Sequence, residues 1–185
     1  MERLVNDLRQ LSRAEAGQLT LNVSPVSPSD VVGTATEGMR PLFEEKGVEL
    51  GVAVPKGLPP VSADGDRVAQ VLTNILDNAL GHTPPGGRVT VEVRPGAGEV
   101  AFRVADTGEG LAPGDLGRVF ERFYRVEKSR SRSGERGGSG VGLTISKALV
   151  EAMGGRIRAE SLGIGCGAAF QFTLPAAKLT RTGGA

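Results

Sequence analysis

Two asparagines stand four residues apart in a segment whose other residues are typical of a buried helix. Asn74 and Asn78 lie within residues 70–79, and this spacing places both amides on one helix face, about one turn apart. Asparagine is a mediocre helix former, and amides beside apolar neighbours need polar partners. Two interpretations stay open: the amides are surface groups, or their carbonyl oxygens are offered to a hard cation and its phosphates.

A second segment follows a predicted strand and combines an aspartate with alternating glycines. It reads Asp106-Thr107-Gly108-Glu109-Gly110, which is compatible with a simple Asx turn. The glycines at 108 and 110 would also let the backbone approach a planar ligand closely. In that interpretation Asp106 accepts a hydrogen bond from an exocyclic amine of the ligand.

A third segment is rich in glycine and opens a predicted helix. Residues 137–143 read Gly-Gly-Ser-Gly-Val-Gly-Leu. Free backbone N–H groups at a helix N-terminus form a binding site for anions such as phosphate. No Gly-Lys-Ser/Thr follows, so the segment is not a Walker A loop, and the polar stretch before it argues against a dinucleotide-binding fingerprint. A flexible linker is the alternative.

Positive charge is concentrated just before this glycine-rich segment. Residues 122–136 hold six basic and two acidic side chains, whereas the whole chain of 185 residues has a net charge of only +1. The stretch is either a solvated loop or a mobile lid over a polyphosphate. Phe120, Phe123 and Tyr124 precede it, and we expect their burial to anchor the base of the lid.

The length and composition of the chain exclude several classes of protein and several kinds of site. The length favours one domain, and the near-neutral charge argues against a nucleic-acid module acting through a basic field. The chain has no apolar run long enough to span a membrane and no signal peptide, so a cytoplasmic location is expected. Its one cysteine, Cys166, excludes an internal disulfide and any multi-cysteine metal site. The 28 glycines exceed the usual share about twofold, and His82 is the one histidine.

The helices and strands that carry these residues can be predicted from hydrophobic periodicity, helix caps and turn residues. The pattern predicts a two-layer α/β sandwich of the α+β class, with helices covering one sheet face. Helices are expected at 1–16, 30–46, 65–82, 115–121 and 141–153, a strand at 19–23, another at 48–54, and hairpins at 88–94/99–105 and 155–160/168–174.

Taken together and in this order, the four segments resemble the catalytic ATP-binding domain of sensor histidine kinases of two-component systems. Residues 74–83 match the N box of that family, 106–110 its first glycine box, 120–125 its F box and 138–143 its second glycine box. The resemblance spans about residues 18–175. Residues 1–17 look like the end of a dimerisation helix, and 176–185 are expected to form a flexible tail.

The resemblance implies a Bergerat ATP-binding fold with a mixed, mostly antiparallel sheet and a lid at about 122–140. It implies that Asp106 binds the adenine amino group, that Gly108 and Gly110 shape that pocket, and that Asn78, with Asn74 nearby, coordinates Mg²⁺. The full set of ATP-binding residues implied by the resemblance is Asn74, Asn78, His82, Asp106, Gly108, Gly110, Phe120, Tyr124, Arg125, Gly138, Ser139, Gly140, Val141, Gly142 and Leu143.

The chain departs from the family pattern in two places. Gly81 stands where the N box usually has a lysine, and we expect an arginine or lysine of the lid to take over its role toward phosphate. His82 fits the aromatic slot that follows and is expected to pack near the nucleotide. The second departure is that the sequence lacks the histidine box that carries the phosphoacceptor, so autophosphorylation in isolation is not expected.

The implied function is binding of Mg·ATP and transfer of its γ-phosphate to a histidine of a dimerisation domain, with a response regulator downstream. No nucleic acid partner and no membrane contact are expected for this chain. An ATPase of the gyrase, mismatch-repair or chaperone type would carry a glutamate at position 74, because asparagine cannot act as a general base. Two further interpretations stay open: a serine kinase of the anti-sigma-factor type, and a non-catalytic nucleotide-binding module.

Overall fold

The computed structural model describes residues 9, 12, 18–124 and 140–178. The elements in chain order are β1 (Ser24–Val26), α2 (Pro28–Lys46), β2 (Glu49–Ala53), β3 (Val61–Ala63), α3 (Gly65–His82), β4 (Arg88–Pro95), β5 (Glu99–Asp106), the 3₁₀ turns η1 (Pro113–Asp115) and η2 (Arg118–Phe120), α4 (Gly142–Ala152), β6 (Arg156–Glu160) and β7 (Ala169–Pro175).

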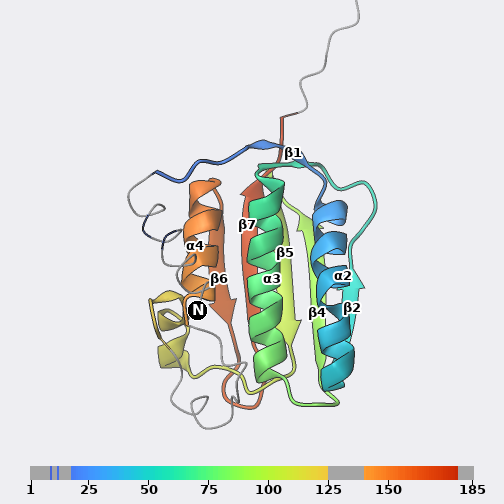
Figure 1. Cartoon of the computed structure of the whole chain (residues 1–185), viewed down its shortest axis with the longest axis vertical. Coiled ribbons are helices and arrows are strands. Elements are labelled where there is room, and N and C mark those ends of the chain that lie inside the picture. The colour runs from blue at the N-terminus through green and yellow to red at the C-terminus, as the bar shows by residue number, and fades with distance from the viewer. Residues whose placement is uncertain (1–8, 10–11, 13–17, 125–139, 179–185) are drawn as a thin grey trace, which may run out of the picture.

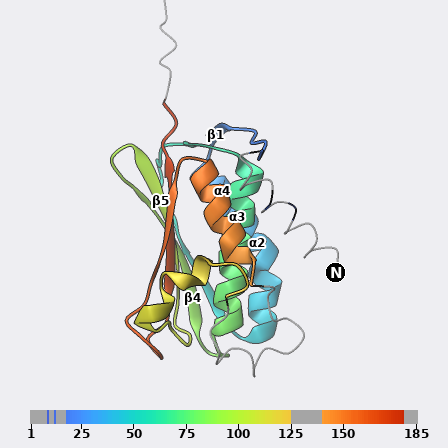
Figure 2. The same ribbon diagram turned by 90° about the vertical axis from the view of Figure 1, so that its left-hand side faces the viewer.

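These elements form two layers. Figure 1 shows α2, α3 and α4 side by side in front of the sheet, with α3 between the other two. Figure 2, turned by 90°, shows α2, α3 and α4 together on one side of the sheet. The five-stranded sheet has the order β2-β4-β5-β7-β6, in which only the β2–β4 pair is parallel. The predicted fold class, a mixed and mainly antiparallel sheet covered on one face by helices, is confirmed.

The two longest helices begin at side-chain caps that the sequence indicates. The Ser27 hydroxyl accepts a hydrogen bond from the Asp30 N–H at the start of α2, and the Asp64 carboxylate accepts from the Arg67 N–H at the start of α3. Each cap satisfies one of the free N–H groups of a first turn. Gly47 ends α2 in a left-handed conformation, with φ of 69°.

The core lies between the helices and the sheet. On β5 the inward-facing residues Val100, Phe102 and Val104 are at most 1% exposed, and the Phe102 ring stacks on Phe172 of β7 at 4.8 Å between centroids. On the helix side, α3 contributes its buried face to the same core: Val68, Val71, Leu72, Ile75, Leu76, Ala79 and Leu80. Burial of this apolar surface is what holds α3 against β5.

Two sequence predictions need correction, and three others fall wholly or mostly outside the described residues. The strand predicted at 19–23 is wrong, since the first strand is Ser24–Val26, and the predicted helix at 115–121 is two short 3₁₀ turns. Most of the expected helix 1–16 with its 1–17 dimerisation remnant, most of the 122–140 lid and most of the 176–185 tail lie outside the described residues. Among the described helices, none is both long and apolar enough to cross a membrane.

Candidate functional site

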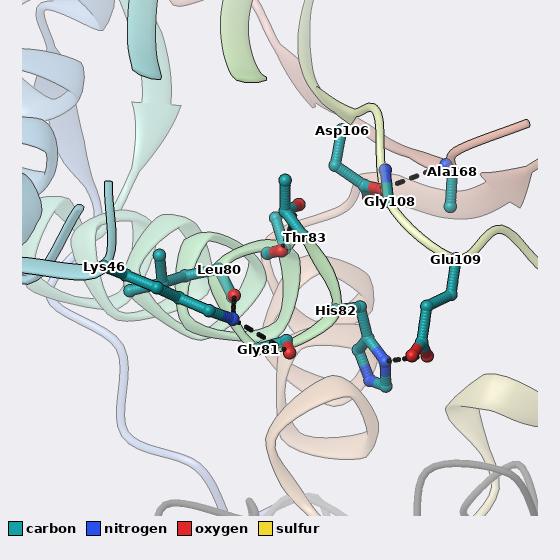
Figure 3. A network of polar contacts seen from close by, with 10 residues as sticks. Lys46, Leu80, Gly81, His82, Thr83, Asp106, Gly108, Glu109 and Ala168 are labelled. Atoms are coloured by element: carbon teal, nitrogen blue, oxygen red, sulfur yellow. Dashed lines mark hydrogen bonds and ion pairs between the residues drawn. The ribbon is translucent and has the colours of Figure 1, made fainter. Parts of the chain in front are cut away.

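Asp106 sits at the end of the core-facing row of β5. It continues the inward alternation of Val100, Phe102 and Val104, and only 9% of its surface is exposed. Its Oδ1 accepts hydrogen bonds from the Gly108 N–H at 2.8 Å and from the Ala168 N–H at 3.3 Å (Figure 3). Within the described chain no donor reaches its Oδ2. The backbone therefore orients this carboxylate and leaves one oxygen for another partner.

Burial is the main influence on the pKa of the Asp106 carboxyl. Desolvation raises the pKa of Asp106 above its ordinary value, and the two backbone donors and the His82 side chain partly oppose that rise. A carboxylate that is costly to ionise and has a free oxygen gains from a hydrogen-bond donor supplied by a ligand.

The first glycine box packs on other backbone segments. A β-carbon at Gly108 would lie closer than 3.0 Å to the His82 carbonyl oxygen and to Asp106 Oδ1, and one at Gly110 would meet the Gly163 carbonyl. Gly110 also has φ of 69°, a conformation that glycine adopts without strain. Glycine is thus required here for close approach within the chain itself, before any ligand is considered.

The loop between β6 and β7 completes this arrangement, and the sequence analysis missed it. The Gly165 N–H donates to the Glu109 carbonyl at 2.6 Å, and the Gly167 N–H donates to the Gly108 carbonyl at 3.2 Å. Gly167 has φ of 71°, and a β-carbon there would meet the Asp106 carbonyl oxygen. The alternating glycines at 163, 165 and 167 are the signal that could have identified this loop.

The C-terminal end of α3 meets the first glycine box. His82 Nδ1 lies 3.3 Å from Glu109 Oε2, with both side chains about 40% exposed, and the Glu109 N–H donates to the His82 carbonyl at 3.2 Å. Figure 3 shows His82 and Glu109 pointing toward each other from α3 and from the loop after β5. The structure thus brings His82 close to the Asp106 loop.

A residue that the sequence analysis did not consider lies beside Gly81. Lys46, the last residue of α2, donates through Nζ to the carbonyls of Leu80 at 2.5 Å and Gly81 at 3.2 Å (Figure 3). Desolvation lowers the pKa of Lys46, and the nearby Glu109 carboxylate opposes that shift. The ammonium offsets the negative end of the α3 dipole, and so a cation does lie next to Gly81, although it comes from α2.

The two asparagines of α3 differ in their partners. Asn74 Nδ2 donates to the Gly142 carbonyl at 3.2 Å and to Ser146 Oγ at 3.4 Å. The half-buried Asn78 side chain makes no hydrogen bond with the described part of the chain. No group of three or more His, Cys, Asp or Glu side chains within that part could hold a metal. The amide oxygens of asparagine side chains are of the kind that suits a hard cation.

The described residues of the F box differ in their contacts. Phe120 is 9% exposed and packs edge-on against Phe170, and the Tyr124 hydroxyl donates to Asp115 Oδ1 at 2.6 Å. The expected burial of Phe123 is wrong, because 59% of its surface is exposed. Phe120 contributes to the core, whereas the described contacts of Tyr124 lie within η1, η2 and the residue after η2.

The second glycine box is described only in part. The Gly140 carbonyl accepts from the Phe123 N–H at 3.2 Å, Val141 is fully buried, and α4 begins at Gly142. Leu143 packs partly against the core. The other predicted ATP-binding residues, Arg125, Gly138 and Ser139, lie outside the described residues.

Comparison with known proteins identifies the family. Residues 63–178, more than half of the chain, match the family of histidine kinase-, DNA gyrase B- and HSP90-like ATPases. The chain belongs to this family. The resemblance inferred from the four sequence boxes is thereby confirmed.

Proteins similar to this chain include sensor histidine kinases and other sensor proteins. WalK of Bacillus subtilis, a sensor histidine kinase, is 38% identical over 95% of the chain and 28% of its own length. Sensor protein DivL of Caulobacter vibrioides is 35% identical over 95% of the chain and 22% of its own length. The chain thus spans less than a third of either relative. The crystal structure of full-length ShkA in complex with AMPPNP superposes with a TM-score of 0.83 at 36% identity, covering 95% of this chain and 35% of ShkA.

Proposed function

We propose that this chain binds Mg·ATP and presents the γ-phosphate to a histidine on the dimerisation domain of a two-component sensor kinase. The observation that carries the proposal is the Asp106 carboxylate, buried at the end of β5 with Oδ1 held by backbone N–H groups and Oδ2 without a donor in the described chain. An adenine amino group is a donor of the kind that this oxygen lacks. ShkA, which is 36% identical to this chain, is solved in complex with AMPPNP, and this supports nucleotide binding by the present chain.

The described residues fit a bound Mg²⁺ and polyphosphate. Asn78 offers an amide without a hydrogen-bond partner in the described chain, and Asn74 lies on the same face of α3. Bound Mg²⁺ would neutralise phosphate charge. The N-terminal turn of α4 at Gly142 and Leu143 supplies backbone N–H groups suited to phosphate.

In this proposal the role of the chain in phosphoryl transfer is to position the ATP. Phosphoryl transfer needs alignment and charge neutralisation more than covalent participation by the protein. Asp106 and the glycine loops would bind the adenine, and Asn74 and Asn78 would bind the Mg²⁺ that neutralises the phosphates. Position 74 is an asparagine, which cannot activate water as a general base, and this favours transfer to a protein over hydrolysis. The acceptor histidine and the response regulator would come from outside this sequence, in a cytoplasmic setting.

Titration calorimetry with AMPPNP, with Mg²⁺ and with EDTA, tests the binding site. Asp106→Asn should lower the affinity at least about tenfold, because a charge-assisted hydrogen bond contributes about 1.5–3 kcal/mol. Asn78→Ala should lower it only with Mg²⁺ present. Asp66→Asn, at the exposed opposite end of α3, is the matched control. Unchanged affinity in Asp106→Asn would overturn the adenine assignment.

A second assay separates transfer from hydrolysis. A histidine-bearing dimerisation domain is added in trans together with labelled ATP, and acid-labile phosphate on that domain is the expected product. Rapid release of inorganic phosphate by this chain alone would favour the ATPase interpretation instead.

A further inference from the structure

Ser146 lies on the buried face of α4 and joins two elements of the candidate site. Its side chain is fully buried. Its Oγ donates to the Gly142 carbonyl at 2.9 Å and accepts from Asn74 Nδ2 at 3.4 Å. The Gly142 carbonyl also accepts from Asn74 Nδ2, at 3.2 Å. Three polar groups thus form a closed set between α3 and the first turn of α4.

This set determines which way the Asn74 amide faces. A side-chain amide presents two N–H donors at one end and an acceptor oxygen at the other. The Gly142 carbonyl can only accept, and the Ser146 hydroxyl has already directed its proton to that carbonyl, so both require the nitrogen of Asn74. Turning the amide over would place its oxygen against the Gly142 oxygen and lose that hydrogen bond, and Ser146 could then donate to the amide oxygen only by giving up its own bond to the Gly142 carbonyl.

The opposite end of the amide is consequently free for a ligand. In the described chain Asn74 Oδ1 has no donor, and it is not among the buried atoms that lack a partner. Asn74 and Asn78 share one face of α3, so this oxygen lies on the side where the proposed cation and phosphates bind.

We propose that Ser146 is a positioning residue for the nucleotide site: with the Gly142 carbonyl it holds the Asn74 amide so that Oδ1 faces the Mg²⁺–phosphate side. The proposal rests on the proposed function, since it assigns Asn74 to the metal-dependent part of ATP binding. It adds a residue of α4 that touches neither base nor phosphate and acts only through Asn74.

The chain offers a matched control two residues away. Thr144 Oγ1 is a buried hydroxyl without a hydrogen-bond partner in the described structure. Ser146→Ala and Thr144→Val each remove one hydroxyl from α4, but only the first removes a contact with Asn74. Ser146→Cys keeps a weaker acceptor at position 146 and serves if the alanine variant does not fold.

The test measures AMPPNP affinity of the full chain with Mg²⁺ and with EDTA. Ser146→Ala should reduce the enhancement by Mg²⁺ about threefold to tenfold, the usual effect of one neutral hydrogen bond, and leave the affinity in EDTA unchanged. Ser146→Cys should give a smaller loss, and Thr144→Val none. On an Asn74→Ala background, Ser146→Ala should have no further effect on the enhancement. A merely structural role would lower both affinities together and would persist in the double variant.

A second readout does not depend on nucleotide. In nitrogen-15 NMR spectra of the nucleotide-free protein, the Asn74 side-chain N–H₂ signals should shift and exchange faster with water in Ser146→Ala, and should stay unchanged in Thr144→Val. If Ser146→Ala keeps the wild-type enhancement of affinity by Mg²⁺, or if its Asn74 signals are unaltered, the role of Ser146 is overturned and the proposed function still stands. Wild-type protein that binds AMPPNP equally with Mg²⁺ and EDTA would overturn the metal part of the proposed function, and the proposal with it.

Discussion

The backbone of Gly108 lies so close to the end of α3 that a β-carbon at position 108 would come within 3.0 Å of the carbonyl oxygen of His82. The next residue, Glu109, donates its N–H to the same oxygen at 3.2 Å. The N box and the first glycine box therefore meet through main-chain atoms. The orientation of Asp106, whose Oδ1 accepts from the Gly108 N–H, depends on that contact.

Gly108→Ala is expected to disturb folding and binding together. The added methyl group must displace the His82 carbonyl or Asp106 Oδ1, and forced shifts of this kind cost about 1–3 kcal/mol. Urea unfolding should show the lower stability, and calorimetry a weaker affinity for AMPPNP. Gly114→Ala, where a β-carbon meets nothing within 4 Å, should change neither. A Gly108→Ala protein as stable as wild type would contradict the close packing described here.

Gly81→Lys is expected to strengthen ATP binding up to about fivefold, because a surface-exposed cation paired with an anion contributes about 0.2–1 kcal/mol. Position 81 is exposed, and a β-carbon there has open space, so the helix accepts a side chain. The gain should decline as salt is raised from about 50 mM to about 500 mM, because salt screens exposed charges. Gly81→Gln is the neutral control of similar length. Equal gains in both variants would mean that helix propensity, and not charge, is responsible.

Asp106→Asn is expected to stabilise the nucleotide-free protein at neutral pH. The pKa of this carboxyl is raised in the folded state by burial, so its contribution to stability is present below the unfolded-state pKa and is lost as pH rises through the folded-state pKa. Asparagine keeps the acceptor at Oδ1 without the charge. The melting temperature should rise by about 2–4 °C for each kcal/mol gained, and the advantage should shrink as pH falls.

The same titration predicts how ATP affinity depends on pH. Protonation of Asp106 removes its carboxylate acceptor, so wild-type affinity should fall with decreasing pH, starting above the range of an ordinary aspartate because its pKa is raised. His82 and Glu109 face this loop, and His82→Gln measured in parallel separates the contribution of the imidazole. A flat affinity profile in wild type and His82→Gln alike would contradict the role given to Asp106.

Phe102→Ala is expected to destabilise the fold by about 3–5 kcal/mol. Phe102 is fully buried, pairs with Phe172 across β5 and β7, and stacks on it with 4° between the ring planes. Phe123→Ala removes the same side chain from a position that is 59% exposed, and its effect should be within about 0.5 kcal/mol. Urea denaturation of both variants provides the comparison. Similar losses would mean that Phe123 is packed more tightly than its exposure indicates.

Much of the fold follows from local sequence signals. The caps at Ser27 and Asp64 begin α2 and α3, and the alternation of β5 predicts both its buried face and the position of Asp106 at the end of that face. Signals of this kind act over one or two turns and are visible in the sequence. The strand predicted at 19–23 failed because alternation alone does not supply a pairing partner: residues 24–26 pair with β3 instead.

The contacts that complete the site are not local. Glu109 meets Gly165 and Gly108 meets Gly167 through main-chain hydrogen bonds, and Lys46 reaches the end of α3 from α2. The alternating glycines at 163, 165 and 167 mark the β6–β7 loop as unusual, but they do not indicate its partners, because almost every residue has a carbonyl and an N–H. They follow from the order of the strands, which places the β6–β7 loop beside the end of β5.

The sequence by itself determined the family, the residue types of the candidate site and the elements α3, β5 and α4 that carry most of them, since periodicity, caps and glycine spacing are properties of short segments. Only the tertiary structure decided how those residues are held. Asn74 and Ser146 are 72 residues apart, and the direction of the Asn74 amide depends on the packing of α4 against α3. The glycines at 108 and 110 are likewise needed where backbone segments come into contact. This need can be recognised only once the structure shows which atoms a β-carbon at either position would meet.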